Sequence, residues 1–149
     1  MVNSLQVLTN NNQETQKFAE NFAKSLKGGE VLCLYGDLGY GKTTFIQGLA
    51  KGLGITSKII SPTFIIMRSY RVRSKNQEAG IRKFYHVDLY RINSEQEIFD
   101  IGLLDLVNDS GNIVAIEWSE KMGNLLTQKR IDIKLEYLDE DKRKITIYT

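Results

Sequence analysis

The sequence is poor in the residues that build disulfide frameworks, zinc sites and interdomain linkers. Its 149 residues include one cysteine, one histidine and one proline. A single thiol forms no internal disulfide, and one cysteine with one histidine supports neither a zinc site nor a Cys/His catalytic dyad. Because Pro62 is isolated and no low-complexity tract is present, nothing indicates a linker, and we expect one domain over residues 1–149.

Long apolar runs are lacking as well. No stretch approaches the roughly 18–20 apolar residues that span a membrane. Residues 1–12 lack the basic flank and apolar core of a signal peptide. Hydrophobic residues make up 42% and charged residues 26%, which is ordinary globular usage and excludes disordered and fibrous classes. We therefore expect a cytoplasmic protein without a membrane partner.

The net charge of +2 conceals an uneven distribution. Residues 68–91 hold seven Lys or Arg and two Asp or Glu, a balance of +5. Residues 92–120 hold seven Asp or Glu and no Lys or Arg, a balance of −7. Blocks of opposite sign indicate either surfaces for different partners or two solvated faces. The sequence leaves both interpretations open.

Apolar periodicity and turn residues predict strands that alternate with helices. The expected strands cover residues 4–8, 31–35, 63–72, 81–88, 112–116, 131–138 and 144–148. One expected helix follows the capping residues 10–12, and the others cover residues 43–53, 94–100 and 119–128. Ser94 and Glu97 are spaced as a capping box. The last two strands read as a hairpin. Such alternation places the chain in the α/β class.

One segment carries a specific chemical signature. Residues 36–43 fit the pattern G-x-x-x-x-G-K-[ST] at every fixed position, between an expected strand and an expected helix. Glycines let backbone N–H groups wrap a phosphate, and the helix N-terminus adds partial positive charge. We expect Lys42 to bridge the β- and γ-phosphates and the Thr43 hydroxyl to hold Mg²⁺. The predicted nucleotide-binding residues are Asp37, Gly39, Tyr40, Gly41, Lys42, Thr43 and Thr44.

Hydrolysis needs acidic groups near that loop, and the sequence offers two. The apolar strand at residues 113–116 ends in Glu117, which is a Walker B arrangement with Glu in the acidic place. Asp88 lies in an apolar and aromatic segment where a carboxylate needs a partner, such as a metal, Arg91 or a helix terminus. A purely structural role stays open for both acids. We assign no chemistry to His86, because lone histidines more often pack or donate hydrogen bonds.

Four segments, in this order, resemble one family. They are Gly36-Asp37-Leu38-Gly39 with Gly41-Lys42-Thr43-Thr44, then Ser61-Pro62-Thr63-Phe64, then Tyr85-His86-Val87-Asp88-Leu89-Tyr90-Arg91, and last Ile116-Glu117-Trp118. The chain resembles the TsaE family, formerly YjeE, the small ATPases of bacterial tRNA threonylcarbamoyladenosine synthesis. The resemblance covers nearly the whole chain. It implies a P-loop NTPase-like three-layer sandwich with a central mixed sheet and a C-terminal β-hairpin.

The resemblance also implies roles for the matched positions. Thr43, Asp88 and Glu117 would surround Mg²⁺ and the γ-phosphate of ATP, and the catalytic residues would be Glu117, Asp88 and Lys42. Residues 61–64 would form a switch-like loop near the nucleotide, with Trp118 beside the site. Tyr40 departs from the family, which often has a small residue there. The implied partners are TsaD and TsaB, which form a complex, with tRNA contacted indirectly.

Other functions remain open on sequence grounds. A small P-loop kinase would need an acceptor site and an arginine-bearing lid, which residues 68–91 could supply. A non-hydrolysing nucleotide sensor would fit if both acids were structural. A GTPase is disfavoured because no Asn-Lys-x-Asp segment is present to bind guanine. The basic segment could touch tRNA phosphates, although its alternating aromatic residues are more typical of a core.

Overall fold

The computed structural model describes residues 3–37, 39, 41–62, 65–73 and 80–149. Its strands are β1 (Ser4–Thr9), β2 (Val31–Tyr35), β3 (Met67–Arg71), β4 (Lys83–Asp88), β5 (Asn112–Glu117), β6 (Ile131–Tyr137) and β7 (Arg143–Tyr148). Its helices are α1 (Asn12–Ala23), α2 (Lys42–Gly52), α4 (Glu95–Asp100), α5 (Leu103–Val107) and the 3-10 helix η1 (Ser119–Leu125). No helix in these described ranges is long and apolar enough to cross a membrane.

All seven strands join one mixed sheet in the order β1-β7-β6-β2-β5-β4-β3. The four inner strands β6, β2, β5 and β4 run parallel to one another. Antiparallel pairs close both sides of the sheet, with β3 beside β4 and with β1, β7 and β6 as a meander. The predicted α/β class, the mixed sheet and the C-terminal hairpin are therefore confirmed.

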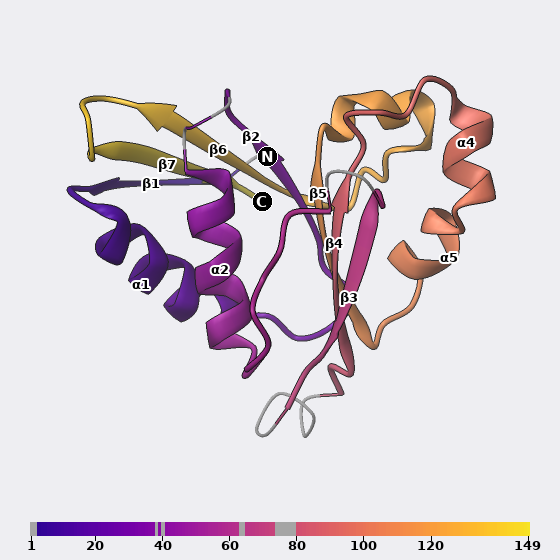
Figure 1. Ribbon diagram of the computed structural model, residues 1–149, viewed down its shortest axis with the longest axis horizontal. Coiled ribbons are helices and arrows are strands. Elements are labelled where there is room, and N and C mark those ends of the chain that lie inside the picture. The colour runs from indigo at the N-terminus through magenta and orange to yellow at the C-terminus, as the bar shows by residue number, and fades with distance from the viewer. Residues whose placement is uncertain (1–2, 38, 40, 63–64, 74–79) are drawn as a thin grey trace.

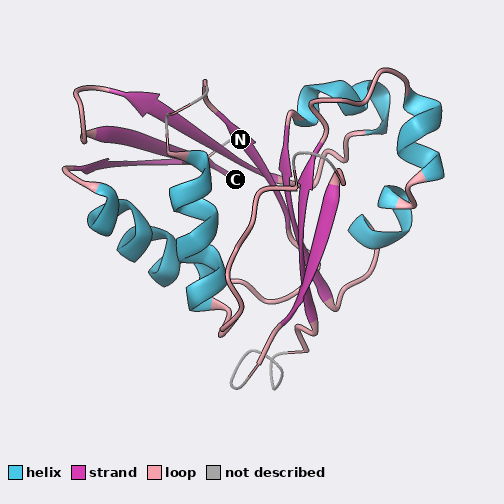
Figure 2. Ribbon diagram, viewed as in Figure 1, coloured by secondary structure: helices cyan, strands magenta, loops and turns pink. Residues whose placement is uncertain are grey.

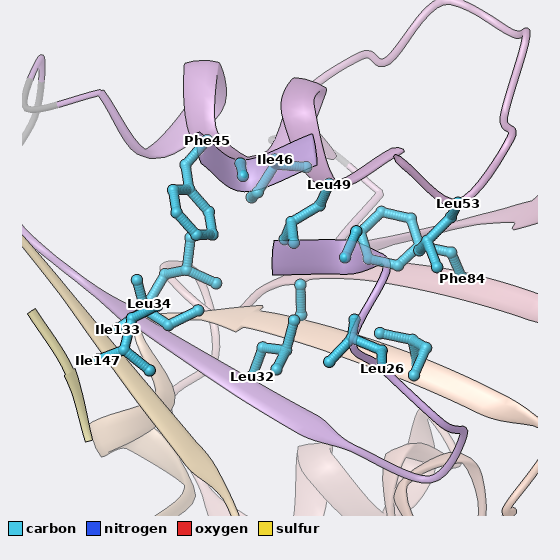
Figure 3. Packing of buried hydrophobic residues seen from close by; sticks show 14 of the residues in the cluster. Leu26, Leu32, Leu34, Phe45, Ile46, Leu49, Leu53, Phe84, Ile133 and Ile147 are labelled. Carbon is cyan, nitrogen blue, oxygen red and sulfur yellow. The ribbon is translucent and has the colours of Figure 1, made fainter. Parts of the chain in front are cut away.

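Helices cover the sheet on two sides (Figures 1 and 2). Helices α1 and α2 lie on one side, and α4, α5 and η1 lie on the other. Strand β2 shows why both layers are needed, because its side chains alternate between them. Leu32 and Leu34 lie in the same core as Phe45 of α2 (Figure 3), whereas Val31 and Cys33 belong to the opposite core. This continuous apolar strand is buried on both faces, as parallel strands generally are.

Two glycines let α1 and α2 pack closely against each other. A Cβ at Gly48 would collide with the backbone carbonyl of Gln16, and one at Gly52 would collide with that of Glu20. Asn11 caps α1 by accepting a hydrogen bond from the Glu14 N–H at 2.8 Å. This close pairing fixes α2 beneath the loop that follows β2.

Several element boundaries differ from the predictions. Strand β3 begins at Met67 rather than at residue 63, and residues 63–64 lie outside the described chain. The segment predicted as a helix over residues 119–128 is a 3-10 helix that ends at Leu125 and bends at Gly123. Helix α5 was not predicted, because five residues are too few to show helical periodicity. Ser94 caps α4 as expected, by accepting from the Glu97 N–H at 3.3 Å.

Candidate functional site

The loop between β2 and α2 has the geometry of a phosphate-binding turn. Its glycines at positions 36, 39 and 41 all have positive φ, and Gly41 is the N-cap of α2 in the left-handed region at φ 94°. A side chain at position 41 would be strained there, which explains the glycine. The first free N–H groups of α2, with its positive dipole end, therefore face the space above the loop.

Two acidic side chains lie beside this loop on neighbouring parallel strands. Asp88 of β4 is the register partner of Glu117 of β5, so both carboxylates lie at the same edge of the sheet. Glu117 is only 6% exposed. Its Oε1 lies 3.6 Å from the Lys42 Nζ, and its Oε2 lies 2.7 Å from the Nε2 of His86. Asp88 accepts a hydrogen bond from the Tyr90 N–H at 3.0 Å.

The two acids differ in their electrostatic setting. Burial alone would raise the pKa of Glu117, but the hydrogen bond and charge of His86 and the charge of Lys42 outweigh it, so that pKa is lowered. Burial raises the pKa of Asp88, and the negative charge of Glu117 adds to that effect against the Tyr90 N–H. The lowered pKa favours the ionised form of Glu117. A cation placed between the two carboxylates would favour the ionised form of Asp88 as well.

A single cavity of about 740 Å³ gathers these groups. It is lined by Asn12, Asp37, Gly39, Gly41, Lys42, Thr43, Thr44, Ser61, Asp88, Tyr90, Glu117, Trp118 and Arg143. Every predicted site residue that the structure describes is in this set. Tyr40 lies outside the described residues, as do Thr63 and Phe64 of the expected switch-like loop. Ser61 of that loop lines the cavity.

The cavity also contains residues that the sequence analysis missed. Arg143, at the start of β7, is 8% exposed and donates through Nη2 to the carbonyl of Gly39 at 3.3 Å. Its Nη1 donates to carbonyls of the hairpin turn, including that of Asp139 at 2.9 Å. In sequence this arginine stands between Lys142 and Lys144 and looks like an ordinary surface cation. Only the hairpin's return to the phosphate loop gives it a place in the site.

Aromatic side chains form one wall of the cavity. Trp118 and Tyr90 have ring centroids 5.2 Å apart, and the Lys42 Nζ lies 5.5 Å from the Trp118 ring centroid. Trp118 has φ 59°, an uncommon conformation for a bulky residue. Ile66, whose carbonyl accepts from the Asp88 N–H, is the other non-glycine residue with positive φ among those described. Such outliers are concentrated at functional sites.

The oxygen donors suit Mg²⁺ better than a soft metal. Thr43 offers a hydroxyl, and Asp88 and Glu117 offer carboxylates, the ligand types that Mg²⁺ prefers. Within the described ranges, no three His, Cys, Asp or Glu side chains gather into a metal-holding group. A magnesium ion here would therefore need phosphate oxygens and water as further ligands, which is how Mg²⁺ usually sits at nucleotide sites.

Comparison with known families agrees with this geometry. Residues 9–145 match the model of the family described as Threonylcarbamoyl adenosine biosynthesis protein TsaE. A relative from Rickettsia felis, named tRNA threonylcarbamoyladenosine biosynthesis protein TsaE, is 41% identical over 96% of this chain and 79% of its own length. The protein of the same name from Bacillus subtilis is 40% identical over 93% of this chain and 81% of its own length.

A solved structure is similar over the full chain. The crystal structure of YdiB from Bacillus subtilis superimposes with a TM-score of 0.75 at 33% sequence identity. The match covers 100% of this chain and 87% of that one. The similarity therefore extends beyond the phosphate loop to the sheet and its edges.

Proposed function

The chain belongs to the TsaE family of tRNA threonylcarbamoyladenosine biosynthesis, and on this premise we propose that it is a Mg²⁺-dependent ATPase of that machinery. The observation that carries the proposal is the single cavity shared by the phosphate loop, Asp88 and Glu117. Lys42 and the α2 N-terminus supply positive charge on one side of it, and two carboxylates supply negative charge on the other. This is the arrangement that P-loop enzymes use to hold a triphosphate and a divalent cation.

Each group has a distinct role in the proposed reaction. The N–H groups of the loop and Lys42 bind the phosphates, and the ion pair of Lys42 with Glu117 opens as the phosphates arrive. Glu117, held ionised, then orients the attacking water and accepts its proton. Thr43, Asp88 and Glu117 would surround Mg²⁺, and the ion would neutralise charge that develops on the phosphoryl oxygens.

The kinase alternative gains nothing from the geometry of the described chain. The basic segment that could have formed a lid contributes strands β3 and β4 to the sheet edge. None of its described Lys or Arg side chains lines the cavity. The buried contacts of Glu117 are more elaborate than a strand-ending acid requires, which weighs against a sensor without hydrolysis. We therefore rank both functions below ATP hydrolysis.

The proposed partners are TsaD and TsaB, on whose complex the chain acts, with tRNA contacted indirectly. The described residues offer no arginine poised over the cavity apart from Arg143, which is occupied with the hairpin turn and Gly39. A partner protein can supply such a cation in trans. This supports a reaction that is slow in the isolated chain.

The test compares the wild-type chain with Glu117→Gln in multiple-turnover phosphate release. The substitution keeps the shape of the side chain but removes its negative charge and basicity. We expect ATP binding to persist in calorimetry and hydrolysis to fall by on the order of 10²-fold. Equal hydrolysis by both proteins would make Glu117 structural. Stoichiometric ADP formation that depends on a small-molecule acceptor would favour the kinase, and absence of turnover would favour the sensor.

A further inference from the structure

His86 is the most deeply buried polar side chain that touches the site. It is 0% exposed and lies on β4, two residues before Asp88 and on the same face of the strand. Its Nε2 is 2.7 Å from Glu117 Oε2, the shortest polar contact that Glu117 makes in the described structure. A carboxylate only accepts hydrogen bonds, so in this contact the imidazole Nε2 is the donor and Glu117 Oε2 the acceptor.

The second ring nitrogen of His86 makes no comparable contact with a described residue. His86 Nδ1 is buried and has no hydrogen-bond partner among the described residues. Most buried polar atoms have a hydrogen-bond partner, so a buried ring nitrogen without one is unusual for a histidine that serves packing alone. Among the described residues, the one hydrogen bond of the His86 ring is with Oε2 of Glu117.

The contact between His86 and Glu117 is important because Lys42, the other partner of Glu117, is also the expected phosphate-binding cation. In the structure Lys42 lies 3.6 Å from Oε1 of Glu117, and it also lines the cavity as the cation of the phosphate loop. When Lys42 turns to a phosphate, Glu117 keeps only its contact with His86. A buried carboxylate without any partner would reorient or take up a proton.

We propose that His86 is a positioning residue, which holds Oε2 of Glu117 so that Oε1 faces the cavity while Lys42 binds phosphate. This proposal rests on the proposed ATPase function and names a residue that the sequence analysis left without a role. His86 does not touch the nucleotide. It acts through Glu117, as hydrogen-bonding partners of functional carboxylates do elsewhere.

A matched pair of substitutions separates the hydrogen bond from the packing. Met and Gln are nearly equal in size and shape, but only Gln offers an N–H at the distance of the imidazole Nε2. We expect His86→Met to lower kcat by roughly 10–100-fold, the usual cost of losing such a partner. His86→Gln should stay within about threefold of wild type, and the ATP Kd of both variants should change little, because neither side chain contacts the phosphates.

A double-mutant cycle with Glu117→Gln tests whether the two residues act as one unit. If His86 acts only through Glu117, His86→Met should cost little further activity once Glu117 is Gln. A full additional loss of activity in the double variant would overturn the proposal. Equal activity of wild type and His86→Met, alongside a crippled Glu117→Gln, would also overturn it while leaving the ATPase function intact.

A spectroscopic arm needs no catalysis. His86 is the only histidine in the chain, so its imidazole gives one set of ¹⁵N signals. We expect a proton on Nε2, and a shift of that signal in Glu117→Gln. A bare Nε2, or a signal indifferent to Glu117→Gln, would overturn the proposal. If wild type shows no hydrolysis, this arm still decides whether the contact exists, so failure of the ATPase function is distinguished from failure of the inference.

Discussion

Lys42 is the residue on which nucleotide binding should depend most. Its side chain lies against Glu117 on one side and the Trp118 ring on the other, and both contacts keep it at the cavity. Cations at such a place interact with phosphates through charge-assisted hydrogen bonds that water screens only weakly. In the proposed function, the ion pair with Glu117 would hold this cation in position until a phosphate replaced the carboxylate.

We predict that Lys42→Ala weakens ATP binding by roughly 2–4 kcal/mol, as for truncation of one partner of a buried charged contact. Calorimetry with ATP and Mg²⁺ measures this directly. Lys51→Ala is the matched control, because Lys51 belongs to the same helix but has a side chain that is 71% exposed. Unchanged affinity in Lys42→Ala would show that the loop is not the binding site.

Cys33 gives a pH-dependent prediction about the core beneath the site. Burial raises the pKa of its thiol from 9.0 to about 11. Between those values the unfolded chain loses the proton while the folded chain keeps it, so the free energy of unfolding should fall as pH rises. Relative to Cys33→Ala, the wild type should lose about 2 kcal/mol by pH 11. Urea unfolding of both proteins at pH 8, 9.5 and 11 tests this, and a constant difference would contradict it.

Among the elements, the helix pair α1–α2 sets the position of the phosphate loop. A Cβ at Gly48 would lie 2.7 Å from the Ala19 Cβ and closer still to the Gln16 carbonyl. Backbone cannot yield as a flexible side chain can. The two helices must therefore separate if this glycine is replaced.

We predict that Gly48→Ala lowers the free energy of unfolding by about 1–3 kcal/mol, the usual cost of overpacking. The loss would occur although Ala favours helix more than Gly does by about 1 kcal/mol. Urea unfolding measures it, with Lys51→Ala as an exposed control expected to stay within about 0.5 kcal/mol. A stabilised Gly48→Ala variant would contradict the close packing of α1 and α2.

The elements that the sequence predicted well are those with strong local signals. The strand at residues 31–35 is an unbroken apolar run between Glu30 and Gly36, and the structure starts and ends it at the predicted residues. The terminal hairpin has clear alternation, and it forms in the expected antiparallel pairing. In contrast, η1 begins after a positive φ at Trp118 and bends at Gly123. Neither feature can be predicted from the spacing of apolar residues.

The residues of the candidate site also differ in how far local sequence signals could predict them. The phosphate loop, Asp88 and Glu117 could be found because a fixed motif and strand ends locate them. The contact of His86 with Glu117 depends on which strands are neighbours, and the place of Arg143 depends on where the hairpin returns. Both contacts follow from the order of the strands in the sheet, which local patterns in a single sequence do not reveal.

At the scale of the whole molecule, the two charge blocks lie at one side of the sheet. The basic block includes the edge strand β3 and its neighbour β4, and the acidic block includes α4, α5 and β5. On the surface, Arg82 Nη2 of the basic block lies 3.1 Å from Asp109 Oδ1 of the acidic block. Most of the described charged side chains in both blocks are exposed, so association with a partner at these surfaces should weaken as salt rises.

The most direct test measures phosphate release by the chain alone and with the TsaD–TsaB complex, each at two salt concentrations. The account predicts slow hydrolysis alone, a higher rate with the complex, and loss of that gain at high salt or in Glu117→Gln. Acceleration would reflect a partner that completes a site already holding the phosphate loop and both carboxylates. Full-speed hydrolysis by the chain alone, indifferent to the complex, would contradict the account and indicate a solitary enzyme.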